Sequence, residues 1–280
     1  MADLCLATSI FRQKDKNLVL EWLFESKPES DLVTARLSLQ AAAYEMPDPA
    51  LSAEVVIEET PDENWLQKCY REFPPFSIGP FYIYGSHHEG QPEGDVPEGQ
   101  MGLQIDATTA FGSGEHETTK GCMQALLDLK GKGVCPWNIL DMGTGSGILA
   151  LAAWKLWKAP VLAVDNDEEA VRVTGRHAEM NGVKVGRGSL LAACGDGFKT
   201  PLVDTQKPYE LIIMNILAGP VIEMAPEAAA VLDDNGYVIL SGMLKEQADL
   251  VASAYEGLGL VLTGRYDLGE WTSLVLQKRS

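Results

Sequence analysis

After residue 100, short apolar runs alternate with longer stretches in which apolar positions recur at helical spacing. The runs have strand length: Trp137–Leu140, Val161–Val164, Leu190–Cys194, Leu211–Met214, Tyr237–Leu240, Leu258–Leu262 and Thr272–Leu276. The helical stretches are Ile148–Trp157, Glu168–Met180, Val221–Leu232 and Lys245–Tyr255. Such alternation is typical of a doubly wound α/β fold with a parallel sheet. No helix fits between the last two runs, so we expect an antiparallel hairpin at one edge of a seven-stranded sheet.

The first 85 residues have a mixed pattern, which predicts a small α+β domain. Strand-like segments are expected at Leu4–Phe11, Leu32–Leu39, Ala53–Ile57 and Phe76–Tyr84, and helices at Leu18–Phe24 and Pro61–Arg71. Pro61 would lie in a first helical turn, where Asp62 and Glu63 suit the helix dipole.

A stretch rich in Gly, Pro and acidic residues, from Gly85 to Gly99, separates the two patterns. It has little to pack and is typical of a linker or an exposed loop. We therefore expect a small domain at residues 1–85, a linker at 86–100 and a main domain at 101–280.

The net charge of the chain excludes some classes of binding partner. The chain carries 40 acidic and 22 basic side chains, a formal net charge of −18. Binding of nucleic acid or of an anionic membrane surface needs clustered Lys and Arg, so we expect neither. Residues 1–99 hold 7 basic and 18 acidic residues, and residues 100–280 hold 15 and 22, so the smaller part is the more acidic.

Cysteine usage indicates a reducing compartment and argues against a metal site. The cysteines are scattered and never form a Cys-x-x-Cys pair: Cys5, Cys69, Cys122, Cys135 and Cys194. This fits neither a disulfide framework nor a zinc site. The start lacks the basic region of a secretory signal, and no run reaches the ~20 apolar residues of a membrane span. We expect a soluble, cytoplasmic protein that binds no metal and is a monomer.

The sharpest chemical feature is Asp141-Met-Gly-Thr-Gly-Ser-Gly147, which follows a strand and precedes a helix. Gly143, Gly145 and Gly147 allow a tight turn and close approach of a ligand, beside donors at the helix N-terminus. The spacing differs from the Gly-x-Gly-x-x-Gly of dinucleotide-binding folds. Asp141 would suit a ligand with a cationic amino group. We expect Asp141 and this glycine loop (residues 143–147) to bind a cofactor; the alternative is a turn without a ligand.

Acidic residues follow the next two strands. Asp165 ends the second strand, about 20 residues beyond the glycine loop, where a carboxylate can accept hydrogen bonds from ribose hydroxyls. Asp167 or Glu168 would cap the following helix. Asp196, in a Gly-Asp-Gly turn after the third strand, would meet an adenine amino group or simply shape the turn.

A hydroxyl-rich loop precedes the first helix of the main domain. Its Gly112-Ser-Gly114 turn leads to Thr118-Thr119, which would bring amides and hydroxyls to a ligand carboxylate or simply cap the helix. His116 is a candidate general base, although a lone histidine in such a loop more often makes a structural hydrogen bond.

Asn215 ends the fourth strand and is followed by Ile-Leu-Ala-Gly-Pro. In open α/β sheets the carboxyl ends of the strands face the ligand crevice. An Asn carbonyl there can accept hydrogen bonds from a nucleophilic amine and aim its lone pair. The alternative is an Asn turn before Gly-Pro.

Together these motifs resemble the class I S-adenosylmethionine-dependent methyltransferases, whose Rossmann-like sheet has seven strands. Within that class, Ala110–Thr119 and Asn215–Pro220 closely resemble the methyltransferase of ribosomal large-subunit protein L-eleven. Glu63–Trp65 and the aromatic Phe81–Tyr84 also resemble the end of that family's substrate-binding domain. The resemblance covers residues 61–280.

The resemblance implies S-adenosylmethionine as cofactor, with contacts at Thr119, Gly143, Asp165 and Asn215. It also implies a ferredoxin-like N-terminal domain that presents the substrate. Such enzymes trimethylate several amines of one ribosomal protein, including lysine side chains and the N-terminal amine. The family usually has Asp-Pro-Gly where this chain has Asp106-Ala107-Thr108, and the first 60 residues match weakly.

We expect a deprotonated amine, oriented by Asn215, to attack the sulfonium methyl directly, without a metal or a dedicated base. Three alternatives stay open: a lysine methyltransferase of another target, such as the electron-transfer-flavoprotein β-subunit, a nucleotide-dependent oxidoreductase, and an inactive methyltransferase-like binding module. Because ribosomal proteins are typically basic, the acidity of the chain would attract the substrate before RNA covers it. The alternative to such attraction is plain solvation.

Overall fold

The computed structural model describes residues 7–12, 18–23, 28–29, 31, 33–35, 37–38, 74–106 and 117–279. Contacts divide the chain into two compact units, Met1–Glu63 and Asn64–Ser280. Among the described residues, no helix is long and apolar enough to cross a membrane.

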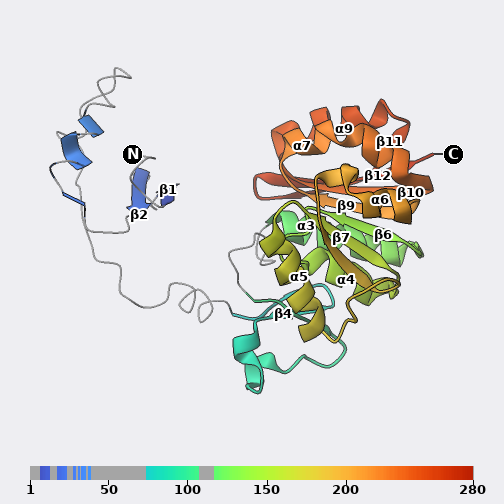
Figure 1. The fold of residues 1–280 in the computed structure, drawn as a ribbon, viewed down its shortest axis with the longest axis horizontal. Helices are drawn as coiled ribbons and strands as arrows, with labels where there is room; N and C mark the ends of the chain where they lie inside the picture. Colours follow the sequence, from blue (N-terminus) through green and yellow to red (C-terminus); the bar gives the residue numbers. More distant parts are fainter. Residues whose placement is uncertain are drawn as a thin grey trace. The chain divides into compact units, whose positions relative to one another are not determined.

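The larger unit is built on a seven-stranded sheet, which confirms the predicted α/β fold (Figure 1). From edge to edge the strands are β11 (Leu260–Leu268), β12 (Trp271–Lys278), β10 (Leu232–Leu244), β9 (Tyr209–Asn215), β6 (Ile139–Met142), β7 (Val161–Asp165) and β8 (Leu190–Cys194). Neighbours from β10 to β8 run parallel, and β12 is antiparallel to both β10 and β11. The predicted hairpin therefore forms at the β11 edge.

Helices cover both faces of this sheet, and each face has its own buried apolar cluster (Figure 1). One layer holds α3 (Glu117–Gly131), α4 (Ile148–Trp157) and α5 (Glu168–Met180). The other holds α6 (Pro201–Gln206), α7 (Ala218–Glu223), α8 (Ala225–Val231) and α9 (Ala248–Glu256). The sequence predicts α4 and α5 correctly. The helix predicted at 221–232 is instead divided at Met224, because Pro226 lacks the N–H that an unbroken helix needs.

A three-stranded sheet also belongs to the larger unit. Its strands are β3 (Phe76–Ile78), β4 (Phe81–Tyr84) and β5 (Met101–Gln104), with β4 antiparallel to β3 and parallel to β5. The predicted linker at 86–100 connects β4 to β5 and contains two 3-10 turns, at Ser86–His88 and Pro92–Gly94. Phe81 and Ile83 are fully buried in the apolar cluster that contains α3 and α4. The contacts divide the chain after Glu63, and the domain boundaries at residues 85 and 100 stay a prediction.

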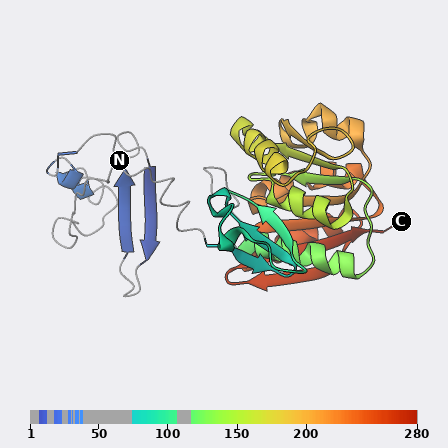
Figure 2. The same ribbon diagram turned by 90° about the horizontal axis from the view of Figure 1, so that it is seen from below.

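The smaller unit contains an antiparallel pair, β1 (Ala7–Arg12) and β2 (Leu18–Leu23), drawn in blue in Figure 2. The helix predicted at 18–24 is thus wrong, because a short apolar run carries too little periodicity to exclude a strand when a partner strand is available. The strand predicted at 32–39 is also wrong: the described residues within 31–38 are helical, and the Val33 N–H donates to the Glu29 carbonyl oxygen at 3.1 Å. The ferredoxin-like arrangement stays a prediction, since residues 39–73, with both elements predicted there, lie outside the described residues.

Candidate cofactor and substrate site

The carboxyl ends of three central strands bring the main predicted site residues together. Met142 at the end of β6 is paired with Val164 of β7 on one side and with Met214 of β9 on the other. The residues that follow these three are therefore neighbours: the glycine loop after β6, Asp165 at the end of β7, and Asn215 at the end of β9. This is the ligand-facing edge of a parallel α/β sheet.

The glycine loop has a backbone conformation that strongly favours glycine. Gly143, Gly145 and Gly147 have φ angles of +75°, +55° and +80°. A Cβ on Gly143 would lie 2.3 Å from Cγ2 of Ile216, so the loop is also packed closely against the residue after Asn215. The loop thus leaves its backbone open to a ligand while its own shape is fixed.

The buried side chain of Asp141 stabilises the glycine loop and the start of α4 by hydrogen bonds. Its carboxylate is buried, and Oδ2 accepts hydrogen bonds from Thr144 Oγ1 at 2.7 Å and from the Ala150 N–H at 3.1 Å. Burial raises the pKa of Asp141 to about 7, and these two hydrogen bonds oppose the increase. The side chain therefore titrates near neutral pH, and its predicted contact with a cationic ligand group stays a prediction.

Asp165 also holds the loop. Oδ2 accepts a hydrogen bond from the Gly145 N–H at 2.9 Å, and Oδ1 accepts one from the Asp167 N–H at 3.1 Å. Asp167 in turn caps α5 by accepting from the Glu169 N–H, as the sequence predicts. Each carboxylate oxygen of Asp165 can accept further hydrogen bonds, so the predicted ribose contact is compatible with this geometry.

Two predicted ligand residues carry buried oxygens without partners among the described residues: Asn215 Oδ1 and Thr119 Oγ1. Thr119 lies in the first turn of α3, and the neighbouring Thr118 carbonyl accepts from Ser241 Oγ at 3.2 Å. Ser241 is the residue paired with Asn215 across β10 and β9, so α3 begins at the same edge of the sheet. Leaving a buried polar atom unsatisfied costs about 1–3 kcal/mol. Both atoms are therefore candidates for a hydrogen bond with a bound molecule.

Other predicted residues lie farther out or outside the described chain. Asp196 follows β8 at this edge, but its side chain is 81% exposed and pairs with Lys199 at 2.9 Å. Its contact with an adenine amino group stays a prediction. His116 and the Ala107-Thr108 departure lie outside the described residues.

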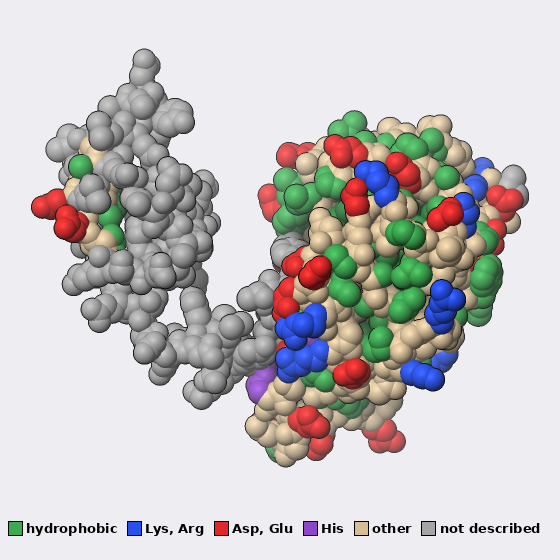
Figure 3. Space-filling model, viewed as in Figure 1, with side chains coloured by type: hydrophobic (Ala, Val, Ile, Leu, Met, Phe, Trp, Pro, Cys, Tyr) green, Lys and Arg blue, Asp and Glu red, His purple; other side chains and the backbone are tan. Residues whose placement is uncertain are grey.

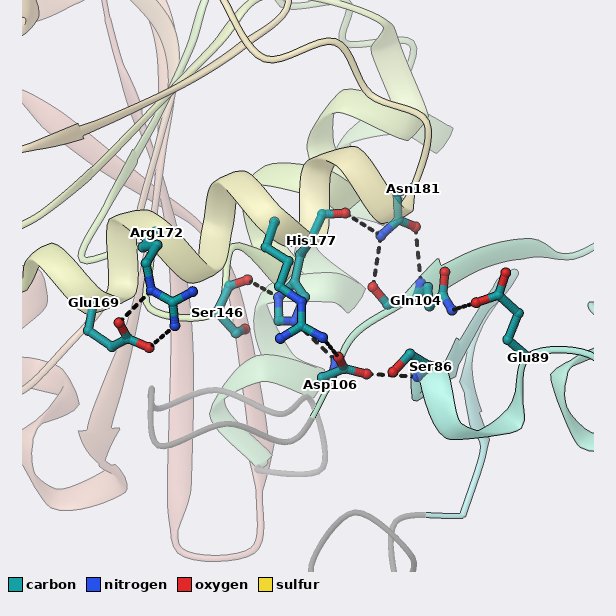
Figure 4. Close-up of polar contacts among 10 residues, drawn as sticks. Ser86, Glu89, Gln104, Asp106, Ser146, Glu169, Arg172, His177 and Asn181 are labelled. Carbon is teal, nitrogen blue, oxygen red and sulfur yellow. Dashed lines mark hydrogen bonds and ion pairs between the residues drawn. The ribbon is translucent and has the colours of Figure 1, made fainter. Parts of the chain in front are cut away.

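A buried polar cluster beside the glycine loop, centred on His177 and Asp106, was not predicted from the sequence (Figure 4). His177 Nε2 accepts from the Asp106 N–H at 3.1 Å, and Nδ1 lies 2.7 Å from the Ser146 carbonyl oxygen. Both residues are nearly inaccessible to solvent. The sequence does hold a signal for this cluster, because polar residues occupy inward positions of a predicted helix. His177 lies at such a position of α5, three residues after the equally buried Thr174.

The order of the strands, the glycine loop after β6 and the acid that ends β7 define the larger unit as a class I methyltransferase, a class that uses S-adenosylmethionine. The family described as ribosomal protein L11 methyltransferase (PrmA) matches residues 7–279. The chain belongs to this family.

Individual relatives agree with this assignment. The ribosomal protein L11 methyltransferase of Rhodopseudomonas palustris is 35% identical over 98% of this chain and 88% of its own length. That of Rhizobium meliloti is 42% identical over 83% and 75%, respectively. Among solved structures, ribosomal protein L11 methylase of Lactobacillus delbrueckii subsp. bulgaricus superposes with a TM-score of 0.63 at 26% identity, over 74% of this chain and all of the other.

The residues present fit S-adenosylmethionine. The cofactor carries hydroxyl and amino groups that can donate hydrogen bonds, and the orphaned oxygens of Asn215 and Thr119 would be able to accept them. The glycines of the loop, at positive φ angles, carry no side chain that would stand between the backbone and a ligand.

Proposed function

We propose that this protein transfers methyl groups from S-adenosylmethionine to amino groups of ribosomal protein L11. Two relatives that carry this name match 98% and 83% of the chain, which supports the substrate. Lysine side chains and the N-terminal amine are the groups that we expect to be methylated. We assign presentation of the substrate to the smaller unit. The way in which that unit presents L11 would decide how many of its amines are methylated.

The observation that carries the proposal is the unpartnered Asn215 Oδ1 at the carboxyl end of β9. It lies beside the glycine loop, since Ile216 contacts Gly143. An acceptor at this place suits a ligand or substrate that brings N–H groups, and an amine nucleophile does so.

The cofactor residues that we assign are Thr119, Asp141, Gly143, Gly145, Gly147, Asp165, Asp196 and Asn215. S-adenosylmethionine, when bound, supplies an electrophilic methyl group on a sulfonium centre. The glycine loop, Asp141, Asp165 and Asp196 would hold it at the edge of the sheet, where Asn215 also lies.

The chain's own part in the reaction is to select and orient a neutral amine. A free lysine amine has a pKa near 10.4, so it must lose a proton before it attacks. A site that excludes water lowers that pKa. Asn215 Oδ1 then accepts a hydrogen bond from the amine and directs its lone pair, so that alignment is the main source of rate.

Labelled S-adenosylmethionine tests the proposal. The protein is incubated with purified ribosomal protein L11, and in parallel with an extract that lacks this activity, and labelled proteins are identified by mass spectrometry. Label in L11, at lysines and the N-terminus, is the expected result. Label in another protein would indicate a methyltransferase of a different target, and cofactor binding without label would indicate an inactive module.

We also propose that the substrate binds in the cytoplasm while it is free of ribosomal RNA, to a monomer of this protein. The net charge of −18 supports the first point, because it disfavours contact with RNA phosphates. Comparing free L11 with assembled large subunits as substrate tests it: faster methylation of assembled subunits would contradict the proposal.

A further inference from the structure

Three side chains from β7 and α5 hold the peptide groups of the glycine loop. Asp165 accepts from the Gly145 N–H, Thr174 Oγ1 donates to the Gly145 carbonyl oxygen at 3.1 Å, and His177 contacts the Ser146 carbonyl oxygen. Thr174 and His177 are three residues apart, so they project from the same face of α5. One face of α5, together with Asp165 at the end of β7, therefore orients the peptide groups of the loop that would bind the cofactor.

The partners of His177 fix its proton. The Asp106 N–H can only donate, so Nε2, which faces it, has no proton. The Ser146 carbonyl can only accept, so the proton is on Nδ1. The ring is thus a neutral bridge from Asp106, two residues after β5, to the glycine loop (Figure 4).

The charged groups that face this ring belong to the same cluster. The Asp106 carboxylate accepts from the Ser86 N–H at 2.7 Å and pairs with Arg176 at 3.0 Å. Burial is the main influence on the ring and lowers the pKa of His177; Arg176 adds to this, while Asp106 and the Ser146 carbonyl oppose it. Neutral His177 is therefore the stable form at neutral pH.

We propose that His177 is a positioning residue for cofactor binding, which holds the Ser146 peptide and so keeps the glycine loop in its binding conformation. The inference rests on the proposed function only in taking S-adenosylmethionine as the ligand. A proton on Nε2 would set two N–H groups against each other and break the bridge to Asp106. Cofactor affinity then depends on the protonation of a residue that does not itself touch the cofactor.

Two substitutions separate the halves of the bridge. In His177→Asn, the side-chain amide can take the place of Nδ1 and still donate to Ser146, but it does not reach Asp106. In His177→Gln, the longer side chain can accept from the Asp106 N–H in place of Nε2 but leaves Ser146 unpaired. Asn181→Ala is the matched control, since Asn181 is the C-cap residue of α5 and bonds to the backbone of Gln104 and to the His177 carbonyl rather than to the ring.

The experiment is calorimetric titration of each folded protein with S-adenosylhomocysteine between pH 8 and pH 5.5. At pH 8 we expect His177→Gln to bind roughly two- to tenfold more weakly than wild type, and His177→Asn to bind more tightly than His177→Gln. As the pH falls through the lowered pKa of His177 and the ring gains its proton, wild type loses the bond to Asp106 but keeps the bond to Ser146. The ratio of the Kd of His177→Asn to that of wild type should therefore approach one, and the ratio for His177→Gln should decrease but stay above one. For Asn181→Ala the ratio should stay constant, and any titration of Asp141 is shared by all four proteins and cancels.

Hydrogen exchange gives a readout without ligand or turnover. The Asp106 amide should lose protection in His177→Asn and keep it in His177→Gln at pH 8. The inference is overturned if the Kd ratios do not change with pH, or if His177→Gln binds as tightly as wild type at pH 8. Absence of methyl transfer to L11 with these binding results intact would overturn the proposed function and leave the inference standing.

Discussion

The Asp141 carboxylate accepts hydrogen bonds from Thr144 and Ala150 in the glycine loop region, but it is buried where a charge is disfavoured. Its pKa of about 7 lies above the value near 3.9 of an unfolded chain, so the folded state binds the proton more tightly. The stability that this gives is fully present below about pH 4 and is lost as the pH rises through 7. At pH 8 the carboxylate is buried and charged, and a ligand cation would relieve that cost.

We therefore predict opposite effects of Asp141→Asn on stability and on binding. The Asn oxygen can still accept from Thr144 and Ala150, so the free protein should gain thermal stability relative to wild type, and more at pH 8 than at pH 5. S-adenosylhomocysteine should bind roughly tenfold or more weakly, because a charge-assisted contact is lost. Thermal melts at both pH values and calorimetry check this; unchanged affinity would contradict a direct role for Asp141.

Asn215 and Asn138 form a matched pair that separates function from stability. Asn138 is buried and donates from Nδ2 to the carbonyls of Gln206 and Pro208, whereas Asn215 Oδ1 has no partner among the described residues. Asn215→Ala should reduce kcat/KM for L11 by about 10²-fold with little change in the melting temperature. Asn138→Ala should lower the free energy of unfolding by about 1–3 kcal/mol while the folded protein keeps its kcat. Wild-type turnover in Asn215→Ala would exclude the role assigned to it.

At the scale of elements, sequence patterns predicted the sheet better than its surroundings. The strands β6 to β9 lie in short apolar runs bounded by helices. Both the apolar pattern and the length of these runs therefore indicate buried strands. The packing of the small sheet could not be predicted, because burial of Phe81 and Ile83 against α3 and α4 is a long-range effect. The positions of candidate site residues were predictable where they lie at a strand end, as at Asp165 and Asn215. His177 was not, since its partners are the backbones of Asp106 and Ser146, which no side-chain motif reports.

Helix α3 reaches the site because Gly121 lets it approach the sheet closely. A Cβ at Gly121 would lie 2.3 Å from Ser273 Oγ and 3.1 Å from Ser273 Cβ. Ser273 in turn contacts Ser241, which bonds to the Thr118 carbonyl. Gly121→Ala should therefore move the start of α3, and with it the adjacent Thr119, away from the sheet.

We expect Gly121→Ala to lower the free energy of unfolding by about 1–3 kcal/mol and to weaken binding of S-adenosylhomocysteine. Gly131→Ala, at the end of the same helix, is the control: a Cβ there meets nothing within 4 Å, so stability should be unchanged or slightly higher. Chemical denaturation and calorimetry measure both. Equal behaviour of the two variants would show that the close approach does not position α3.

At the scale of the whole molecule, the observed division of the chain sharpens its charge asymmetry. Residues 1–63 carry 5 basic and 13 acidic residues, a net charge of −8, and residues 64–280 carry 17 and 27, a net charge of −10. The smaller unit is therefore far more acidic for its length. On the face of the larger unit drawn in Figure 3, acidic side chains are scattered and interleaved with basic ones. A basic substrate would thus be attracted more strongly by the smaller unit.

The attraction between L11 and the smaller unit should depend on salt and on the carboxylates of the smaller unit. Raising the ionic strength shortens the screening length from about 10 Å at 0.1 M to about 3 Å at 1 M, so association with L11 should slow about tenfold or more between 0.05 and 0.5 M salt. Glu58→Gln with Glu59→Gln should reduce both the association rate and its salt dependence. Glu93→Gln with Glu98→Gln, at exposed positions of the larger unit, removes the same charge and should do so less. Stopped-flow binding measures all three proteins; if salt does not alter the rate, or both double variants act alike, the acidity serves solvation rather than substrate capture.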